Sequence, residues 1–315
     1  MNLRNSHAGA IAWLDSTGKT ESLLTTPGRY YSPSFSPDGK RMVLSSAGDS
    51  GGINLAVYDW QRDIMTRLGS TRGPDYWPVW TPDGKGIVYC SRSAGGYGIY
   101  WVRSDGASAS VQLMESKDIL APHSFSPDGK RLAYFDSGGE TQGDLWTLPI
   151  DWSDPEHPKP GKPEVFLRTP AGEIDPVFSP DGRWIAYSSN EGPKTEIYVR
   201  PFPADPSGGK WQASNGGGRL AVWSRNGREL FYEAEDQIMV VSYAVQGASF
   251  IPDKPRLWSS HRLVSSENFR NYDLAPDGKR FAIVKPIEEA KPTTQVNVLL
   301  NFFDELRRRA PSGGK

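Results

Sequence analysis

A six-residue motif that occurs six times along the chain constrains its fold more than any other feature. The first copy is residues 35–40 (Phe-Ser-Pro-Asp-Gly-Lys), and its glycine recurs at positions 84, 129, 182, 227 and 278, with spacings of 45, 45, 53, 45 and 51 residues. The copy at residues 223–228 is degenerate and has the sequence Trp-Ser-Arg-Asn-Gly-Arg. A strand-rich repeat of roughly 40–50 residues is typical of the blades of a β-propeller.

Each copy of the motif has the chemistry of a tight turn. Proline presets φ for the second turn position, aspartate tolerates the third, and glycine accepts the left-handed backbone region. Apolar segments flank the turns, as in residues 41–44 (Arg-Met-Val-Leu) and 86–89 (Gly-Ile-Val-Tyr). The sequence therefore predicts a β-hairpin in every repeat, with positive φ at Gly39, Gly84, Gly129, Gly182, Gly227 and Gly278.

Two further strands are predicted after each hairpin. A polar loop leads to an apolar segment such as residues 53–58 (Ile-Asn-Leu-Ala-Val-Tyr), and a weaker segment such as residues 66–68 follows. We therefore predict an all-β fold, a six-bladed β-propeller with four-stranded blades, in which residues 1–315 form a single domain. The hairpins are expected at about residues 29–46, 75–92, 119–137, 172–189, 217–234 and 268–285.

The two ends of the chain are predicted to share one blade. Residues 8–25 contain two strand-like segments with no hairpin motif before them, and the last repeat ends with residues 295–300 (Gln-Val-Asn-Val-Leu-Leu). We expect the N-terminal strands, residues 8–25, to complete the last blade and residues 301–315 to form a C-terminal tail. Closure of the ring would remove exposed sheet edges. Closure by C-terminal strands is the alternative.

Composition excludes several classes of protein. The chain is 37% hydrophobic and 11% aromatic with a formal net charge of −1, so it is a globular protein and not a disordered one. Only Arg307–Arg308–Arg309 forms a basic run, which is too short to predict nucleic-acid binding. No apolar run of about 18 residues occurs, so no membrane insertion by this chain is expected. The single cysteine, Cys90, lies in an apolar segment and is interpreted as a buried hydrophobic residue.

Cofactor and location are less constrained. The four histidines lack metal-ligand spacing, so neither a metal nor a cofactor is expected. The N-terminus does not read as a signal peptide. The chain as given is therefore expected in the cytoplasm, or in the periplasm if it is part of a larger membrane-anchored protein.

The residues just before the innermost strand of each blade form the candidate site. They differ between repeats while the turn is constant, and the innermost strands of a propeller surround its axis. We therefore expect these side chains to form an aromatic, mixed-charge ring at one mouth of the central channel: Tyr31, Tyr76, Trp77, His123, Asp175, Arg219, Arg270 and Tyr272. Such a ring suits a protein, a peptide or a glycan as ligand. The alternative is that several of the aromatic residues only pack between blades.

The motif, followed each time by a short apolar strand, resembles the TolB-like, WD-like propeller repeats of bacteria over about residues 8–303. A narrower resemblance lies at the ends. Residues 11–19 (Ile-Ala-Trp-Leu-Asp-Ser-Thr-Gly-Lys) and residues 297–306 (Asn-Val-Leu-Leu-Asn-Phe-Phe-Asp-Glu-Leu) are similar to the first and last segments of propellers fused to bacterial serine/threonine protein kinases. This similarity implies an extracytoplasmic sensor or interaction domain. No kinase motif is present, so kinase activity is not carried over.

The sequence therefore favours a non-catalytic ligand- or protein-binding propeller that is not an enzyme. One alternative is a propeller enzyme of the lyase or glycosidase type, but Asp175 has no second carboxylate at a matching position. The other is the gating propeller of a prolyl oligopeptidase-like hydrolase that lacks its catalytic domain. A proline-rich insertion at residues 151–163 is expected to be a surface loop that either contacts a partner or is merely tolerated.

Overall fold

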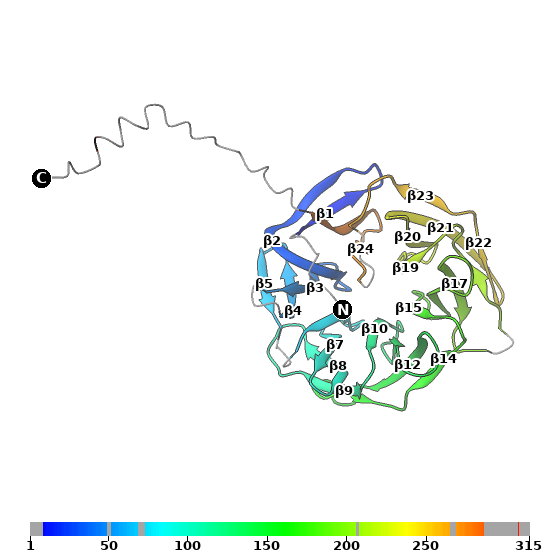
Figure 1. Cartoon of the computed structure of the whole chain (residues 1–315), viewed down its shortest axis with the longest axis horizontal. Coiled ribbons are helices and arrows are strands. Elements are labelled where there is room, and N and C mark those ends of the chain that lie inside the picture. The colour runs from blue at the N-terminus through cyan, green and yellow to red at the C-terminus, as the bar shows by residue number, and fades with distance from the viewer. Residues whose placement is uncertain are drawn as a thin grey trace, which may run out of the picture.

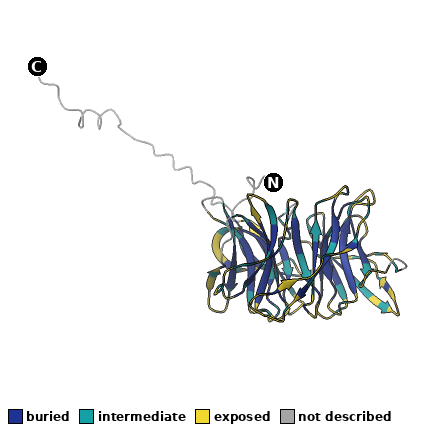
Figure 2. Ribbon diagram, turned by 90° about the horizontal axis from the view of Figure 1, so that it is seen from below, coloured by how far each residue is buried: buried dark blue, intermediate teal, exposed yellow. Residues whose placement is uncertain are grey.

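The computed structural model describes residues 9–48, 52–68, 73–205, 208–264, 269–286 and 308. Within them, 25 β-strands form antiparallel sheets. The sheets stand around a central axis, and the chain passes from one to the next around the ring (Figure 1). Seen from the side, the strands run between two opposite faces of a disc (Figure 2). The prediction of an all-β fold with the architecture of a β-propeller is confirmed.

Four sheets each contain one copy of the repeat. The first contains β6 (Asp75–Trp80), β7 (Gly86–Ser93), β8 (Gly96–Arg103) and β9 (Val111–Ser116). The second contains β10 (Leu120–Phe125), β11 (Arg131–Asp136), β12 (Asp144–Asp151) and β14 (Glu164–Leu167), and β13 (Lys159–Pro160) also pairs with β12. The third contains β15 (Glu173–Phe178), β16 (Trp184–Ser189), β17 (Glu196–Pro201) and β18 (Trp211–Gln212). The fourth contains β19 (Arg219–Trp223), β20 (Glu229–Ala234), β21 (Gln237–Gln246), β22 (Ser249–Pro252) and β23 (Arg256–Ser259).

The fifth sheet has seven strands and joins the two ends of the described chain. In order across the sheet they are β24 (Tyr272–Leu274), β25 (Arg280–Pro286), β1 (Gly9–Asp15), β2 (Thr20–Phe35), β3 (Arg41–Ala47), β4 (Ile53–Asp59) and β5 (Ile64–Arg67). The long strand β2 pairs with β1 as far as Gly28 and with β3 from Arg29 onward. β1 also pairs with β25 along its whole length. The N-terminal strands thus lie beside the last hairpin, where the sequence placed residues 8–25. The strand expected at residues 295–300 lies outside the described residues, as does the expected tail apart from Arg308.

The core lies between neighbouring sheets. One cluster joins Phe231 of β20 to Tyr272 and Phe281 of the seven-stranded sheet. Tryptophans of the innermost strands also tie the sheets together, because the indole N–H of Trp80 donates to the Ser34 carbonyl at 2.9 Å. Cys90 is fully buried, and burial raises the pKa of its thiol to about 12, so this cysteine is an inert core residue.

The six repeated turns have the predicted backbone. Gly39, Gly84, Gly129, Gly182, Gly227 and Gly278 have φ values of +70°, +71°, +71°, +71°, +65° and +68°. In the first turn, the Ser36 hydroxyl donates to Asp38 Oδ1 at 2.6 Å, and the backbone N–H of Lys40 donates to the same oxygen at 3.0 Å. The aspartate side chain therefore closes the turn on itself, which explains why the motif needs an acceptor before its glycine.

Alanine substitution is expected to distinguish two of these glycines. A Cβ at Gly39 would lie 2.5 Å from Cγ of Pro276, whereas a Cβ at Gly278 has no neighbour within 4 Å. Both residues have positive φ, so Gly278→Ala should lower the free energy of unfolding by about 1 kcal/mol through backbone strain alone. Gly39→Ala adds overpacking and should lower it by about 2–4 kcal/mol. Urea unfolding of both variants checks this; equal losses would contradict the contact between the two turns.

Candidate functional site

A register shift of the β-bulge type interrupts five innermost strands near the same end, whereas β24 pairs with β25 without one. The register shifts between Tyr31 and Ser34 in β2, and between Tyr76 and Val79 in β6. Equivalent shifts occur in β10, β15 and β19. Four residues inside these shifts have positive φ without being glycine: Ser32 (49°), Trp77 (50°), Asp175 (58°) and Leu220 (57°). A bulge redirects a side chain, and a repeated strained backbone of this kind is characteristic of binding sites.

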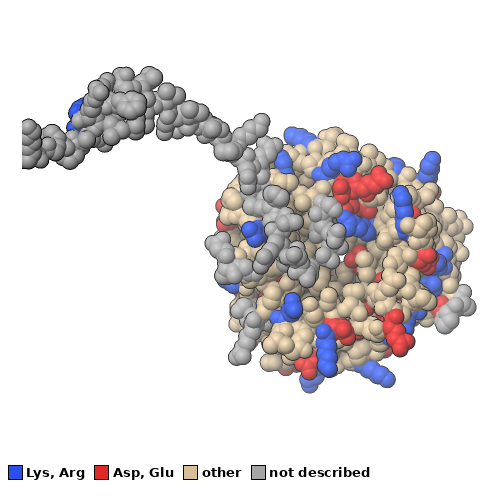
Figure 3. Space-filling model, in the orientation of Figure 1, with Lys and Arg blue, Asp and Glu red and all other residues tan. Residues whose placement is uncertain are grey.

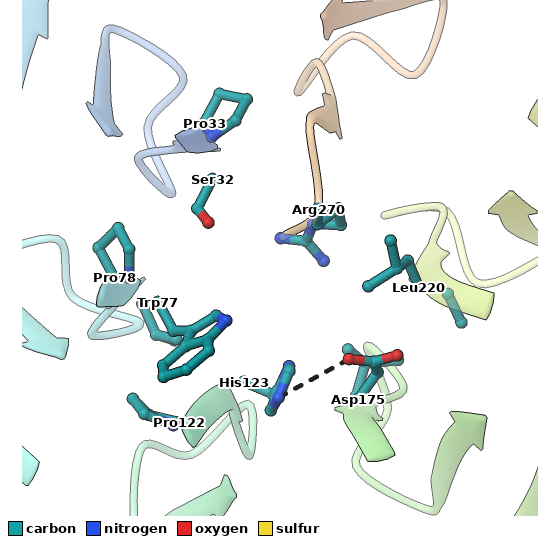
Figure 4. Close-up of a pocket in the computed structure, with 12 residues that line it drawn as sticks. Ser32, Pro33, Trp77, Pro78, Pro122, His123, Asp175, Leu220 and Arg270 are labelled. Atoms are coloured by element: carbon teal, nitrogen blue, oxygen red, sulfur yellow. Dashed lines mark ion pairs between the residues drawn. The ribbon is translucent and has the colours of Figure 1, made fainter. Parts of the chain in front are cut away.

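The bulges surround a small pocket on the channel axis, which we call the mouth pocket. Figure 4 shows that the side chains of Ser32, Trp77, His123, Asp175 and Arg270 converge on it from different strands. Its lining consists of Ser32, Pro33, Trp77, Pro78, Val79, Pro122, His123, Asp175, Val177, Leu220, Ala221 and Arg270. The cavity measures about 40 Å³, which is room for a few water molecules. Only a narrow chemical group can enter it without rearrangement.

Two charged groups face each other across the mouth pocket (Figure 4). Asp175 Oδ2 accepts a hydrogen bond from the Ser188 hydroxyl at 3.1 Å, and Asp175 Oδ1 lies 3.8 Å from Nε2 of His123. On the other side, the Arg270 guanidinium lies 3.6 Å from Asp273, which is too long for a hydrogen bond. The pocket therefore presents an acceptor on one side and a cationic donor on the other.

Burial determines the protonation of Asp175 and His123 in the mouth pocket. Desolvation raises the pKa of Asp175 to about 6, although the Ser188 hydrogen bond and the nearby Arg270 oppose this rise. Desolvation, with repulsion from Arg270, lowers the pKa of His123 to about 3. At pH 7 the imidazole is therefore neutral, and the carboxyl group has lost its proton. Asp175 and Arg270 carry the opposite charges of the pocket at this pH.

The structure brings four of the eight predicted site residues to the mouth pocket: Trp77, His123, Asp175 and Arg270. Arg219 forms an ion pair with Glu233 at 2.6 Å and is not part of the lining. Tyr31 and Tyr76 are buried against Phe269, with ring centroids 5.3 and 5.9 Å away. Whether any of these side chains binds a ligand stays a prediction.

Tyr272 requires a correction, because it does not reach the mouth. It is fully buried between two sheets, and its hydroxyl donates to the Leu220 carbonyl at 2.6 Å. The expectation that several aromatic residues only pack between blades therefore applies to it. Ser32 and Leu220, which line the pocket at the bulges, were not selected from the sequence. Phe269, which packs on Trp77 at a ring-centroid distance of 5.7 Å without lining the pocket, was not selected either. Alignment of the repeats already put Ser32 and Leu220 beside the chosen positions.

Other site types are limited in the described part of the chain. Among these residues, no group of three or more His, Cys, Asp or Glu side chains could hold a metal ion. No helix there is long and apolar enough to cross a membrane. On the face of the ring seen in Figure 1, acidic and basic side chains are interspersed without a large patch of either sign (Figure 3).

Fold and pocket together define a β-propeller protein with a polar, bulge-lined opening to its central channel. Residues 8–149 match the TolB beta propeller domain, and the chain is thus similar to TolB-like propellers. This finding agrees with the resemblance seen in the repeated motif.

Three known proteins extend the similarity along the chain. An uncharacterised protein of Agrobacterium fabrum is 27% identical over 287 residues, which cover 86% of this chain and 90% of the relative. The solved structure of a candidate TolB from Agrobacterium tumefaciens matches with a TM-score of 0.65 at 20% identity, covering 90% of this chain and all of the other. TolB from Acinetobacter baumannii matches with a TM-score of 0.60 at 16% identity, covering 80% and 65%. At such identities the solved structures show the fold alone.

Proposed function

We propose that this chain is a non-catalytic propeller that binds an extended segment of a protein or peptide at the mouth pocket. The observation that carries the proposal is that Asp175 and Arg270, which carry opposite charges, both line one narrow pocket whose walls include three prolines. A peptide group offers an N–H to a carboxylate and a carbonyl to a guanidinium, so it complements both sides at once. The small cavity favours a linear group over a sugar ring, which needs a wider site.

Absence of catalysis is part of this proposal. Hydrolysis or elimination at a sugar needs a second acid or base close to the first. Asp175 is the one carboxylate among the residues that line the mouth pocket, and its neighbour His123 has a pKa too low for a general acid or base near neutral pH. A binding role therefore explains the arrangement better than a lyase or glycosidase.

We further propose that the ring contains six blades. The seven-stranded sheet would then count as two blades that share β2: its first part completes β24, β25 and β1, and its second part begins the blade of β3, β4 and β5. The six repeated turns support this count, because each belongs to one hairpin.

A sensor role is the finer form of the same proposal. The similarity of residues 11–19 to the first segment of kinase-fused propellers supports it, while the similar residues 297–306 lie outside the described part of the chain. In that role the propeller would hold a partner protein through the mouth pocket and report its presence to whatever it is attached to.

Selection of peptides from a random display library tests the binding role. We expect the native protein to select linear sequences. Trp77→Ala and Arg270→Ala should each lower the affinity for the selected peptide by at least about tenfold. Arg256→Ala is the matched control, because this exposed arginine pairs with Glu229 away from the pocket. Full affinity in the Trp77→Ala/Arg270→Ala double variant, measured by titration calorimetry, would place the functional surface elsewhere.

A further inference from the structure

A second and much larger pocket lies among the repeated turns, at the opposite end of the innermost strands from the mouth pocket. This turn-face pocket measures about 370 Å³ and lies between the β6–β7 turn and the β10–β11 turn. Its lining is Thr81, Pro82, Asp83, Pro127, Asp128, Gly129 and Trp152. The volume falls in the usual range of ligand pockets and admits a whole side chain.

Trp152 forms one wall, and the proline-rich insertion holds it there. Its indole N–H donates to the Gly129 carbonyl at 2.9 Å, and its ring packs near Phe125 and Trp101 at centroid distances of 6.3 and 6.4 Å. The insertion is fastened to the neighbouring sheet, since Glu156 forms an ion pair with Arg103 at 2.5 Å. The insertion therefore supplies an aromatic surface that is fixed in position.

The charged residues that line the turn-face pocket are both acidic. Asp83 and Asp128 each use Oδ1 inside their own turn, where it accepts a hydroxyl hydrogen bond at 2.6 Å and a backbone N–H. The Ser126 hydroxyl holds the pKa of Asp128 below its ordinary value, so this carboxylate is ionised at neutral pH. Lys85 and Lys130 follow the two turns but do not line the pocket. The charge of the lining favours a cation.

The chain itself shows which cation these turns accept. Arg225 stands where the other turns have proline, and its guanidinium donates to the carbonyls of Pro37 and Ser36, at 2.5 and 3.2 Å. The guanidinium of Arg41 donates to the Gly84 carbonyl at 3.0 Å in the same way. Pro82 and Pro127 occupy the position of Pro37 in the two turns that line the pocket. A guanidinium also stacks on an indole better than a compact ammonium does.

We propose that the turn-face pocket binds an arginine side chain of a partner protein, stacked on Trp152 and paired with Asp83 and Asp128. This site is separate from the mouth pocket and does not depend on its function. It gives the insertion at residues 151–163 a role in recognition.

The sequence supplies a substitution that removes charge and keeps the turn. In the degenerate repeat, Asn226 accepts the same two hydrogen bonds as the aspartates. The donors are the Ser224 hydroxyl at 2.6 Å and the backbone N–H of Arg228 at 3.0 Å. Asp83→Asn/Asp128→Asn should therefore fold normally. Asp181→Asn is the matched control, because it makes the same change in a turn that does not line this pocket.

The probe is the capped pentapeptide acetyl-Gly-Ala-Arg-Ala-Gly-amide, titrated by NMR against the indole N–H signals. We expect saturable binding that is weakened at least tenfold in Asp83→Asn/Asp128→Asn, at least fivefold in Trp152→Ala, and less than twofold in Asp181→Asn. The same peptide with citrulline should bind at least tenfold more weakly, and the lysine peptide about threefold more weakly. The Trp77→Ala/Arg270→Ala variant should bind like the native protein.

Three outcomes would overturn the proposal: no binding of the arginine peptide to the native protein, unchanged binding in the asparagine pair, or equal binding of citrulline. Equal binding of lysine would overturn the guanidinium assignment. Circular dichroism establishes that each variant is folded, and the asparagine pair decides the matter if Trp152→Ala does not fold.

Discussion

Removal of residues 1–25 is expected to abolish the cooperative unfolding of this protein. The deletion takes away β1, which lies between β2 and β25, and the first six residues of β2. The buried side chains of Ile11, Leu14 and Leu24 are lost with them. Loss of one such side chain usually lowers stability by about 2–5 kcal/mol, and a whole domain is stable by only about 5–15 kcal/mol. The truncated chain should also expose the edge of β25 that pairs with β1. We expect no sharp transition in urea or on heating.

The matched control is a chain that lacks only residues 1–8, which precede β1. It should unfold like the full chain, as followed by circular dichroism and tryptophan fluorescence. An unchanged melting transition in the longer truncation would show that another segment, such as residues 295–300, can close the ring instead.

Asp175→Asn is expected to change how stability depends on pH. The pKa of Asp175 is raised to about 6 in the folded protein from an ordinary 3.8, so folding holds a proton that the unfolded chain releases. The stability that this group contributes is fully present below pH 3.8 and is lost as the pH rises through 6. An amide cannot ionise. The free energy of unfolding of Asp175→Asn, compared with that of the native protein, should therefore rise by about 2–3 kcal/mol as the pH is raised from 4 to 7.5.

His123→Gln should show the opposite sign. The pKa of His123 is lowered to about 3 in the folded protein from an ordinary 6.5. The contribution of this histidine is fully present above pH 6.5 and is lost as the pH falls toward 3. The free energy of unfolding of His123→Gln, compared with that of the native protein, should therefore rise by about 3 kcal/mol as the pH is lowered from 7.5 to 4.

Urea unfolding at four pH values between 4 and 7.5 measures both effects. In the native protein the two contributions oppose each other between pH 4 and pH 6, so only the single variants reveal them. Arg270, Arg219 and the buried Asp273 also face this region, and all three are kept in both variants. Parallel pH profiles for the native protein and Asp175→Asn would mean that folding does not raise the pKa of Asp175.

The fold could be predicted because its signals are local. The Pro-Asp-Gly turns depend on the φ preferences of single residues and on hydrogen bonds within six residues, as between Ser36 and Asp38. Their repetition along the chain then favoured a propeller. Placement of the N-terminal strands followed from the two strand-like segments of residues 8–25, which have no hairpin motif before them.

The candidate site could be predicted only in part, because its geometry depends on strand pairing. Side chains alternate between the two faces of a strand, but a bulge inserts one residue and changes that alternation. This is how Trp77 comes to line the mouth pocket while its buried neighbour Tyr76 does not. The burial of Tyr272 against Phe281 likewise depends on two sheets meeting.

By itself, the sequence determined the repeated turns, the all-β architecture and the end of the channel where unlike side chains gather, since these follow from local conformational preferences and their period. Only the tertiary structure decided which of those side chains reach the axis. It also decided that burial lowers the pKa of His123 and raises that of Asp175, and that Trp152 of the insertion lies beside Asp83 and Asp128. The reason is that each of these depends on contacts between segments distant in the chain, which no local pattern encodes.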